Sequence, residues 1–248
     1  MKVLASDFDG TLVFNDKFRK EDLKKIKEFQ KEGNLVGLCS GRPFKGVYEF
    51  CKKYLDLDFY ILCTGALVLD KDGNELFKST ITKQSLENYF NRYQDKYEIY
   101  IQANKQIYTY DKKEMGSMVR KVINSLDEVE GDIYGLSMFA LTDENARKVC
   151  LDIEENFPEL ATHQNKAYID VTAKGCSKGL GINKLKEIYH IDNIAGIGDS
   201  YNDISMLETV DTSFTFHSSP DSLTSIVDHV VDSVSQAIDI LNEDTTTI

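Results

Sequence analysis

Two carboxylates, Asp7 and Asp9, stand one residue apart at the end of a short apolar run that begins at Val3. Residues two apart in a strand point to the same face, so both carboxylates should emerge together where the strand ends, and Gly10 allows the chain to turn there. Two like charges about 4 Å apart repel by roughly 4 kcal/mol at an effective dielectric of 20. A site that keeps both ionised therefore needs a cation, and Mg²⁺ suits an all-oxygen site.

Three further segments carry residues that could bind a charged ligand. Ser40-Gly41-Arg42-Pro43 follows a short apolar run, and Ser177-Lys178-Gly179 opens a helical pattern. The third segment, Gly198-Asp199-Ser200-Tyr201-Asn202-Asp203, is a second acidic cluster that again follows a short apolar strand. In open α/β sheets ligands bind at the carboxyl ends of the strands, which is where Asp7, Asp9 and Ser40 would lie.

The elements around these segments alternate between strands and helices. Residues 20–31 place Leu23, Ile26 and Phe29 at helical spacing, and Gly33 ends the pattern. We predict strands at 34–39 and 59–63 with a helix at 44–55 between them. This order indicates an α/β fold, with a doubly wound, mostly parallel, Rossmann-like sheet whose ligands bind at the carboxyl ends of the strands.

The pattern changes in the middle of the chain and indicates an inserted α+β domain. A hairpin with an Asp-Gly turn is predicted over 67–77, and the alternation of the first part resumes with a helix at 177–189 and a strand at 193–197. We therefore predict a catalytic core over 1–81 and 175–248 and an inserted domain over 82–174. The tyrosines of the insert fit packing on a half-exposed sheet face better than a pocket lining. Its expected elements are a helix at 84–95, a hairpin at Asn104-Lys105, a helix at 112–125, a strand at 133–141, a helix at 143–156 and two strands, the second at 167–171.

Composition and charge limit the possible partners. The chain has 248 residues, 29 Lys and Arg against 41 Asp and Glu, and a formal net charge of -12, which disfavours binding to nucleic acid or to anionic membranes. The five cysteines are scattered and form no CxxC pair, as is typical of a reducing compartment. No segment reads as a signal peptide or a membrane helix. We expect a cytoplasmic protein with a small-molecule partner, and its oligomeric state stays open.

Taken in order, the four segments resemble the motifs of the haloacid dehalogenase superfamily of phosphatases. The resemblance is to the Cof-type subgroup, which carries a large α/β cap between its second and third motifs, and it spans essentially the whole chain. It implies that Asp7 is the nucleophile that forms an aspartyl-phosphate. It also implies that Asp9 acts as general acid and base while its backbone carbonyl binds the metal.

The resemblance assigns roles to the other segments as well. Ser40 and the backbone at Gly41 would hold phosphoryl oxygens, and Lys178 would neutralise the charge that develops near the nucleophile. The acidic loop would complete a Mg²⁺ site made by Asp7, Asp9, Asp199 and Asp203, and Asn202 would bind phosphate. Which member of the Asn202 and Asp203 pair reaches the phosphoryl group or Lys178, and which reaches the metal shell, stays open.

Simpler explanations exist for some of these residues. Ser40 could cap the helix that follows it, and Asp199 could be a turn residue at a strand end. Arg42 could bind substrate or pair with a neighbouring acid. Lys178 would lie in the first turn of its helix, where the dipole disfavours a cation that lacks a partner anion.

Two segments depart from the subgroup pattern. Thr64-Gly65-Ala66 stands where Asn-Gly-Ala is usual, and Phe216-His217-Ser218-Ser219 replaces a Met-Gly-Asn-Ala stretch. Neither departure changes the nucleophile or the metal set, so they bear on loop geometry and substrate preference. We expect a loop role for His217, because Asp9 already supplies the acid and base.

The sequence thus predicts a Mg²⁺-dependent phosphatase of small phosphomonoesters, with sugar phosphates as one candidate class. A phosphomutase resembling phosphomannomutase would share the motif order and the cap. A non-catalytic protein that binds a phosphorylated metabolite is the alternative outside enzymes, and it would have no need of a nucleophile and an acid.

Overall fold

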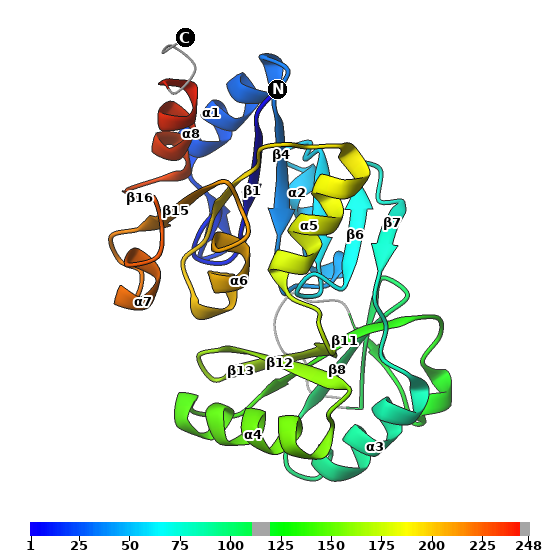
Figure 1. The fold of residues 1–248 in the computed structure, drawn as a ribbon. Coiled ribbons are helices and arrows are strands. Elements are labelled where there is room, and N and C mark those ends of the chain that lie inside the picture. Colours follow the sequence, from blue (N-terminus) through cyan, green and yellow to red (C-terminus); the bar gives the residue numbers. More distant parts are fainter. Residues whose placement is uncertain (111–119, 244–248) are drawn as a thin grey trace.

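The computed structural model describes residues 1–110 and 120–243 and places them around two sheets (Figure 1). The larger sheet has eight strands in the order β16-β15-β14-β1-β4-β5-β6-β7. Its pairings are parallel from β16 to β5 and antiparallel at β6 and β7. The strands are β1 (Val3–Ser6), β4 (Leu35–Cys39), β5 (Phe59–Leu62), β6 (Leu67–Asp70), β7 (Glu75–Lys78), β14 (Ala195–Ile197), β15 (Thr212–Phe216) and β16 (His229–Val231).

Helices cover both faces of this sheet because the side chains of its strands alternate. Leu4 of β1 packs with α1, α2 and α8, whereas its neighbours Val3 and Ala5 pack with α5, α6 and α7. This doubly wound arrangement confirms the predicted fold class. The helices are α1 (Lys20–Lys31), α2 (Phe44–Lys52), α5 (Lys178–Tyr189), α6 (Ile204–Leu207), α7 (Asp221–Thr224) and α8 (Val234–Glu243).

The second sheet has six strands in the order β10-β9-β8-β11-β13-β12, all from residues 99–173, which lie between β7 and α5 in the chain. Helices α3 (Lys83–Tyr93) and α4 (Asp143–Asn156) pack on one face through a buried apolar cluster that includes Leu136 and Ile169. The opposite face of the sheet is turned toward the larger sheet (Figure 1). Its strands are β8 (Ile99–Ala103), β9 (Gln106–Thr109), β10 (Lys121–Val122), β11 (Ile133–Phe139), β12 (Leu160–Asn165) and β13 (Tyr168–Ala173).

The helix predicted at 112–125 is wrong over residues 120–125, the part of it that the structure describes. The sequence pattern predicts a helix at 112–125, and residues 112–119 of it lie outside the described residues. Lys121 and Val122 instead form β10, which pairs in parallel with the edge strand β9, and Ile123 donates its N–H to Thr109. An open strand edge offers hydrogen bonds that a short, weakly amphipathic segment cannot match by coiling alone. The sequence also predicts a frayed segment at 244–248, and these residues lie outside the described ones.

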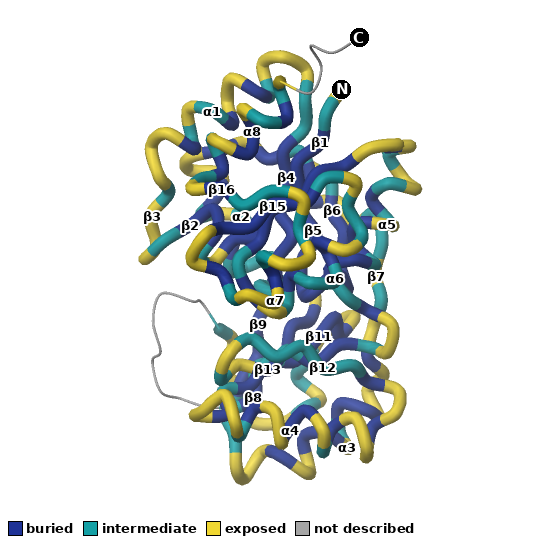
Figure 2. Tube along the Cα trace, turned by 60° about the vertical axis from the view of Figure 1, so that its left-hand side comes forward, coloured by how far each residue is buried: buried dark blue, intermediate teal, exposed yellow. Residues whose placement is uncertain are grey.

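Burial follows this two-sheet plan (Figure 2). The strands of both sheets are largely buried, and exposed residues gather on the outer turns of the helices and on loops. The remaining elements are short: β2 (Val13–Phe14), β3 (Lys17–Phe18) and the 3₁₀ helices η1 (Leu126–Glu128) and η2 (Tyr201–Asp203). Within residues 1–110 and 120–243, no helix combines the length and apolar character needed to span a bilayer.

Candidate active site

Asp7 and Asp9 leave the carboxyl end of β1, the strand that lies between β4 and β14. The backbone N–H of Asp7 donates to the carbonyl of Ile197 at the end of β14, at 2.9 Å. Gly10 then turns the chain with a φ of +84°, a conformation that glycine adopts without penalty. Because β1, β4 and β14 are adjacent and parallel, the loops that follow them meet at one edge of the sheet.

The side chain of Lys178 connects two of these loops, the one after β1 and the one after β14. It is the first residue of α5, it is fully buried, and its Nζ lies 2.5 Å from Asp7 Oδ1 and 2.5 Å from Asp203 Oδ1. Ser177 caps the helix by accepting the N–H of Leu180. The two carboxylates provide the partner anions that a cation at a helix N-terminus requires.

The loop after β14 brings further carboxylates to the same point. Asp203 Oδ2 accepts the backbone N–H groups of Asp199 and Ser200, both at 3.0 Å, so the loop closes on itself. Thr11 donates its hydroxyl to Asp199 Oδ1 at 3.0 Å. Ligand oxygens of Asp7, Asp199 and Asp203 all lie within 4.8 Å of one another.

This concentration of charge shifts the protonation of the group. Burial, followed by repulsion from Asp203, raises the pKa of Asp7 well above its usual range, and the same two causes raise the pKa of Asp199 to about 6. Burial opposes the charge on Lys178, but the charges of Asp203 and Asp7 outweigh it and raise the pKa of this lysine. When ionised, three carboxylates face one ammonium group, so a divalent cation would balance the group and its oxygen donors suit Mg²⁺.

Asp9 points to a different partner. Both of its carboxylate oxygens accept from the guanidinium of Arg42, Oδ2 from Nε at 2.6 Å and Oδ1 from Nη2 at 2.7 Å. The guanidinium also lies over the ring of Phe8, 5.0 Å from its centroid. Of the two possibilities for Arg42, this structure therefore has the pairing with an acid. The Asp9 side chain stays outside the group of Asp7, Asp199 and Asp203.

Ser40 and Gly41 follow β4 beside this group. Ser40 is buried, its Oγ accepts the N–H of Arg42 at 3.2 Å, and its carbonyl accepts the N–H of Thr64 at 3.1 Å. Helix α2 begins only at Phe44, with Pro43 at the N-cap position, so Ser40 does not cap it.

Asp170 is a site residue that the sequence analysis missed. It lies on β13 of the inserted domain, and its carboxylate packs so closely on Gly41 that an added Cβ there would be 2.5 Å from Oδ2. Ser137 donates to its Oδ1 at 2.5 Å and Thr64 approaches its Oδ2 at 3.4 Å. Burial raises the pKa of Asp170 to about 6. The available signal was its position between Ile169 and Val171, which places it on the strand face opposite the apolar core.

The two segments that depart from the subgroup pattern border the site. Cys63, Thr64 and Gly65 have φ of 50°, 54° and 87°, an unusual run of left-handed residues that includes a β-branched one. After β15, Ser219 Oγ donates to or accepts from Thr215 Oγ1 at 2.8 Å, and Thr215 donates to the carbonyl of Gly198 at 2.7 Å. These bonds hold the loop after β15 against the acidic loop.

His217 and Asn202 differ in how far they are buried. His217 is exposed, and its Nε2 lies 4.0 Å from Asp232 Oδ1. Asn202 is partly buried in η2, directly before Asp203.

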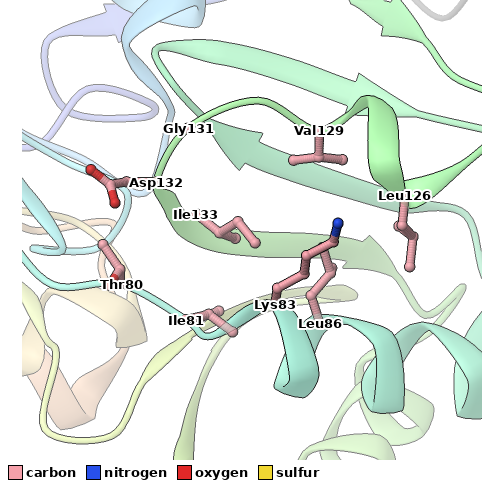
Figure 3. Close-up of a pocket in the computed structure, with 9 residues that line it drawn as sticks. All are labelled: Thr80, Ile81, Lys83, Leu86, Leu126, Val129, Gly131, Asp132 and Ile133. Carbon is pink, nitrogen blue, oxygen red and sulfur yellow. The ribbon is translucent and has the colours of Figure 1, made fainter.

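A small cavity lies elsewhere in the molecule. It has a volume of about 200 Å³ and is lined by Ile81, Lys83 and Leu86 on one side and by Leu126, Val129 and Ile133 on another (Figure 3). Lys83 is paired with Asp127 there. None of the predicted catalytic, metal or phosphate residues lines it, so the cavity is separate from the site at the end of β1.

Comparisons with known proteins agree with this geometry. A sequence model of the haloacid dehalogenase-like hydrolases matches residues 4–238. An uncharacterized protein of Mycoplasma capricolum is 31% identical, over 84% of this chain and 87% of its own length. YwtE of Bacillus subtilis, named as a 5-amino-6-(5-phospho-D-ribitylamino)uracil phosphatase, is 26% identical over 84% of this chain and 85% of its own length.

Solved structures show the same fold. A haloacid dehalogenase-like hydrolase of B. subtilis superimposes with a TM-score of 0.84 at 20% identity, covering 96% of both chains. The subclass IIB sugar phosphatase BT4131 superimposes with a TM-score of 0.81 at 20% identity, covering 98% of this chain and 99% of its own. The chain therefore belongs to the haloacid dehalogenase-like hydrolases, as a member of the Cof-type subgroup.

Proposed function

We propose that the protein is a Mg²⁺-dependent phosphatase of small phosphorylated metabolites that works through an aspartyl-phosphate on Asp7. The observation that carries the proposal is the buried contact of Lys178 with both Asp7 and Asp203, beside Asp199, at the carboxyl end of β1. A carboxylate held by a lysine at a strand end is fixed in direction and can attack phosphorus in line.

The proposed reaction has two steps. In the first step Asp7 attacks phosphorus, the bond to the leaving-group oxygen breaks, and Asp9 donates a proton to that oxygen. In the second step Asp9 takes a proton from water, the water oxygen attacks phosphorus, and Asp7 is released together with inorganic phosphate. Asp9 has to turn away from Arg42 to reach these atoms, since both of its oxygens are bonded to the guanidinium in this structure.

The metal would be held by Asp7, by Asp199 and by the backbone carbonyl of Asp9. The backbone at Gly10 lies against Asp199, where an added Cβ would be 2.5 Å from Oδ2, so this carboxylate adjoins the Asp9–Gly10 turn. When bound, a divalent cation supplies charge neutralisation for the phosphoryl oxygens. One carboxylate oxygen of Asp203 accepts from Lys178, and the other accepts from two backbone N–H groups. Because both oxygens already have donors, we propose that Asp203 supports the metal site without binding the ion directly.

The phosphoryl group would lie between Ser40, the N–H of Gly41 and Lys178, with Asn202 at its edge. We propose that residues 82–174 form the cap over this site and that 1–81 with 175–248 form the catalytic core. Two B. subtilis relatives, 26% and 22% identical, are named as phosphatases of a phosphorylated ribitylamino-uracil, and a sugar phosphatase shares the fold. Phosphorylated polyols and sugars are therefore the substrates that we would assay first.

The test is phosphate release from hexose phosphates, nucleotides, pyridoxal phosphate and flavin mononucleotide, with Mg²⁺ and with a chelator. We expect release that the chelator abolishes and that Asp7→Asn lowers by at least about a thousandfold with the fold intact. An isomerised sugar phosphate without free phosphate would favour the mutase. Binding without any turnover would favour a metabolite sensor, and either result would contradict the proposal.

A further inference from the structure

The cap sheet presents a polar and aromatic face to the core, and one strand supplies its central residues. Tyr168 and Asp170 are two apart on β13 and so share a face. Directly opposite residues in antiparallel strands also share a face, and Tyr168 is opposite Asn165 whereas Asp170 is opposite Ser137. Asn165 accepts a hydrogen bond from Ser200 of the core at 3.0 Å, so this face is the one that meets the core.

The carboxylate of Asp170 is held in a fixed direction by a short relay. Buried Gln102 donates to Ser137 Oγ at 2.8 Å, and Ser137 donates to Asp170 Oδ1 at 2.5 Å. The other oxygen, Oδ2, lies over Gly41, and among residues 1–110 and 120–243 its hydrogen-bond partner is Thr64, at 3.4 Å. One oxygen is thus anchored, and the other keeps acceptor capacity beside the loop proposed to bind phosphate.

Tyr168 is the aromatic residue that stands two residues before this carboxylate on the same face of β13. It is 53% exposed although it is on the face that meets the core, and its ring packs against Phe139 with centroids 4.9 Å apart. A packed pair of rings with one accessible ring is a platform for the flat, apolar face of a sugar or of a heteroaromatic ring.

We propose that Tyr168 and Asp170 form the leaving-group subsite of the phosphatase. The subsite selects neutral, hydroxylated leaving groups: Asp170 accepts a hydrogen bond from a hydroxyl, and Tyr168 covers a flat apolar face. A second negative charge on the leaving group is rejected, because it would lie close to the anchored carboxylate. This inference rests on the proposed phosphatase function and adds the class of substrate to it.

Three cations lie near the subsite. Arg42 is bonded to both carboxylate oxygens of Asp9 in this structure, and the two lysines have other partners or positions. Lys178 is committed to Asp7 and Asp203. Lys166, at the tip of the β12–β13 hairpin, is near enough to Asp199 to lower its pKa and lies toward the acidic loop. None of the three cations is therefore placed to compensate a second anion at Asp170.

The experiment compares sorbitol 6-phosphate with 6-phosphogluconate, two open-chain compounds that differ only in a hydroxymethyl group or a carboxylate at the far end of the leaving group. At about pH 8 Asp170 is ionised, since its pKa is about 6. We expect the wild type to prefer sorbitol 6-phosphate by at least about tenfold in kcat/KM. Asp170→Asn keeps the shape and should reduce this preference about tenfold, whereas Glu155→Gln, which removes an exposed cap carboxylate, should leave it unchanged.

Further arms separate the possible results. Tyr168→Ala should raise KM for glucose 6-phosphate, for flavin mononucleotide or for both, and which of them responds identifies a sugar or a heteroaromatic face. Acetyl phosphate, whose leaving group carries neither feature, measures any general loss of activity in these variants, and the sugar phosphate results are compared with it. If wild type and Asp170→Asn discriminate equally between sorbitol 6-phosphate and 6-phosphogluconate, the subsite is wrong. If the wild type releases no phosphate even from acetyl phosphate with Mg²⁺, the proposed function itself is wrong.

Discussion

At the scale of single residues, Lys178 determines the geometry of the site. Its ammonium is buried between Asp7 and Asp203, and removing one partner of a buried charge network leaves unpaired charge behind. We expect Lys178→Met to lower the free energy of unfolding by about 3 kcal/mol, and kcat by at least about a hundredfold. Urea denaturation and steady-state kinetics measure the two effects.

Lys184→Met is a matched control for this substitution. Lys184 lies on the same helix and pairs with Glu187 at the surface, so its loss should change both stability and kcat little. Equal stability of the Lys178→Met and Lys184→Met variants would contradict the role given to the buried network.

The residues of the site could be predicted to different extents. Asp7, Lys178 and Asp199 each stand in a short local motif at the end of a strand or at the start of a helix. Asp170 could not be found in this way, because its role depends on packing against Gly41 from a different sheet. The partner of Arg42 likewise depends on the direction that the Asp9 side chain takes in the folded chain.

At the scale of elements, the turn after β5 positions helix α5. Gly65 has a φ of +87°, and an added Cβ would lie 1.9 Å from the carbonyl oxygen of Ser177, directly before Lys178. We expect Gly65→Ala to destabilise the protein by more than about 3 kcal/mol, because backbone has to move there. Gly175→Ala is the control: its φ is +85° but nothing lies within 4 Å, so only the left-handed conformation is penalised, by about 1 kcal/mol. Chemical denaturation of both variants checks the difference, and equal losses would contradict the close contact.

The β12–β13 hairpin gives a pH dependence that can be tested separately. His163 Nε2 lies 3.0 Å from Thr172 Oγ1, and burial together with the charge of Lys178 lowers the pKa of His163 to about 4. As pH falls below about 6.5, the unfolded chain takes up a proton that folded His163 does not, and stability is lost down to about pH 4. The free energy of unfolding of His163→Gln, relative to that of the wild type, should therefore rise by about 2 kcal/mol when the pH falls from 8 to 5. Above pH 8 the difference between the two proteins should not change with pH. If the difference in the free energy of unfolding between His163→Gln and the wild type is the same at every pH, the burial of His163 is contradicted.

The secondary structure shows where sequence patterns are sufficient. The alternation of apolar strands and amphipathic helices predicted the doubly wound sheet, because each of these elements buries one well-marked face. The helix expected at 112–125 was wrong at β10, where Val122 and Lys121 use the open edge of β9. Edge pairing depends on which strand ends up unpartnered, and this is a property of the whole sheet.

At the scale of the whole molecule, metal binding should stabilise the fold. Asp7 and Asp199 belong to separate loops of the core, so an ion between them joins segments that are distant in the chain. Mg²⁺ at about a hundred times its dissociation constant should raise Tm by about 5 °C, and Asp199→Asn should remove this increase. Thermal unfolding with Mg²⁺ and with a chelator measures it; an equal shift in Asp199→Asn would place the ion elsewhere.

The central claim is that Asp7 carries the phosphoryl group during turnover, and trapping that intermediate tests it most directly. Asp9→Asn cannot activate water, whereas p-nitrophenyl phosphate has a leaving group that needs no proton, so the first step should proceed and the second should stall. Mass spectrometry of the quenched Asp9→Asn protein should then find a phosphoryl group on Asp7. A phosphoryl group on another residue, or none while the wild type turns over the same substrate, would contradict the account.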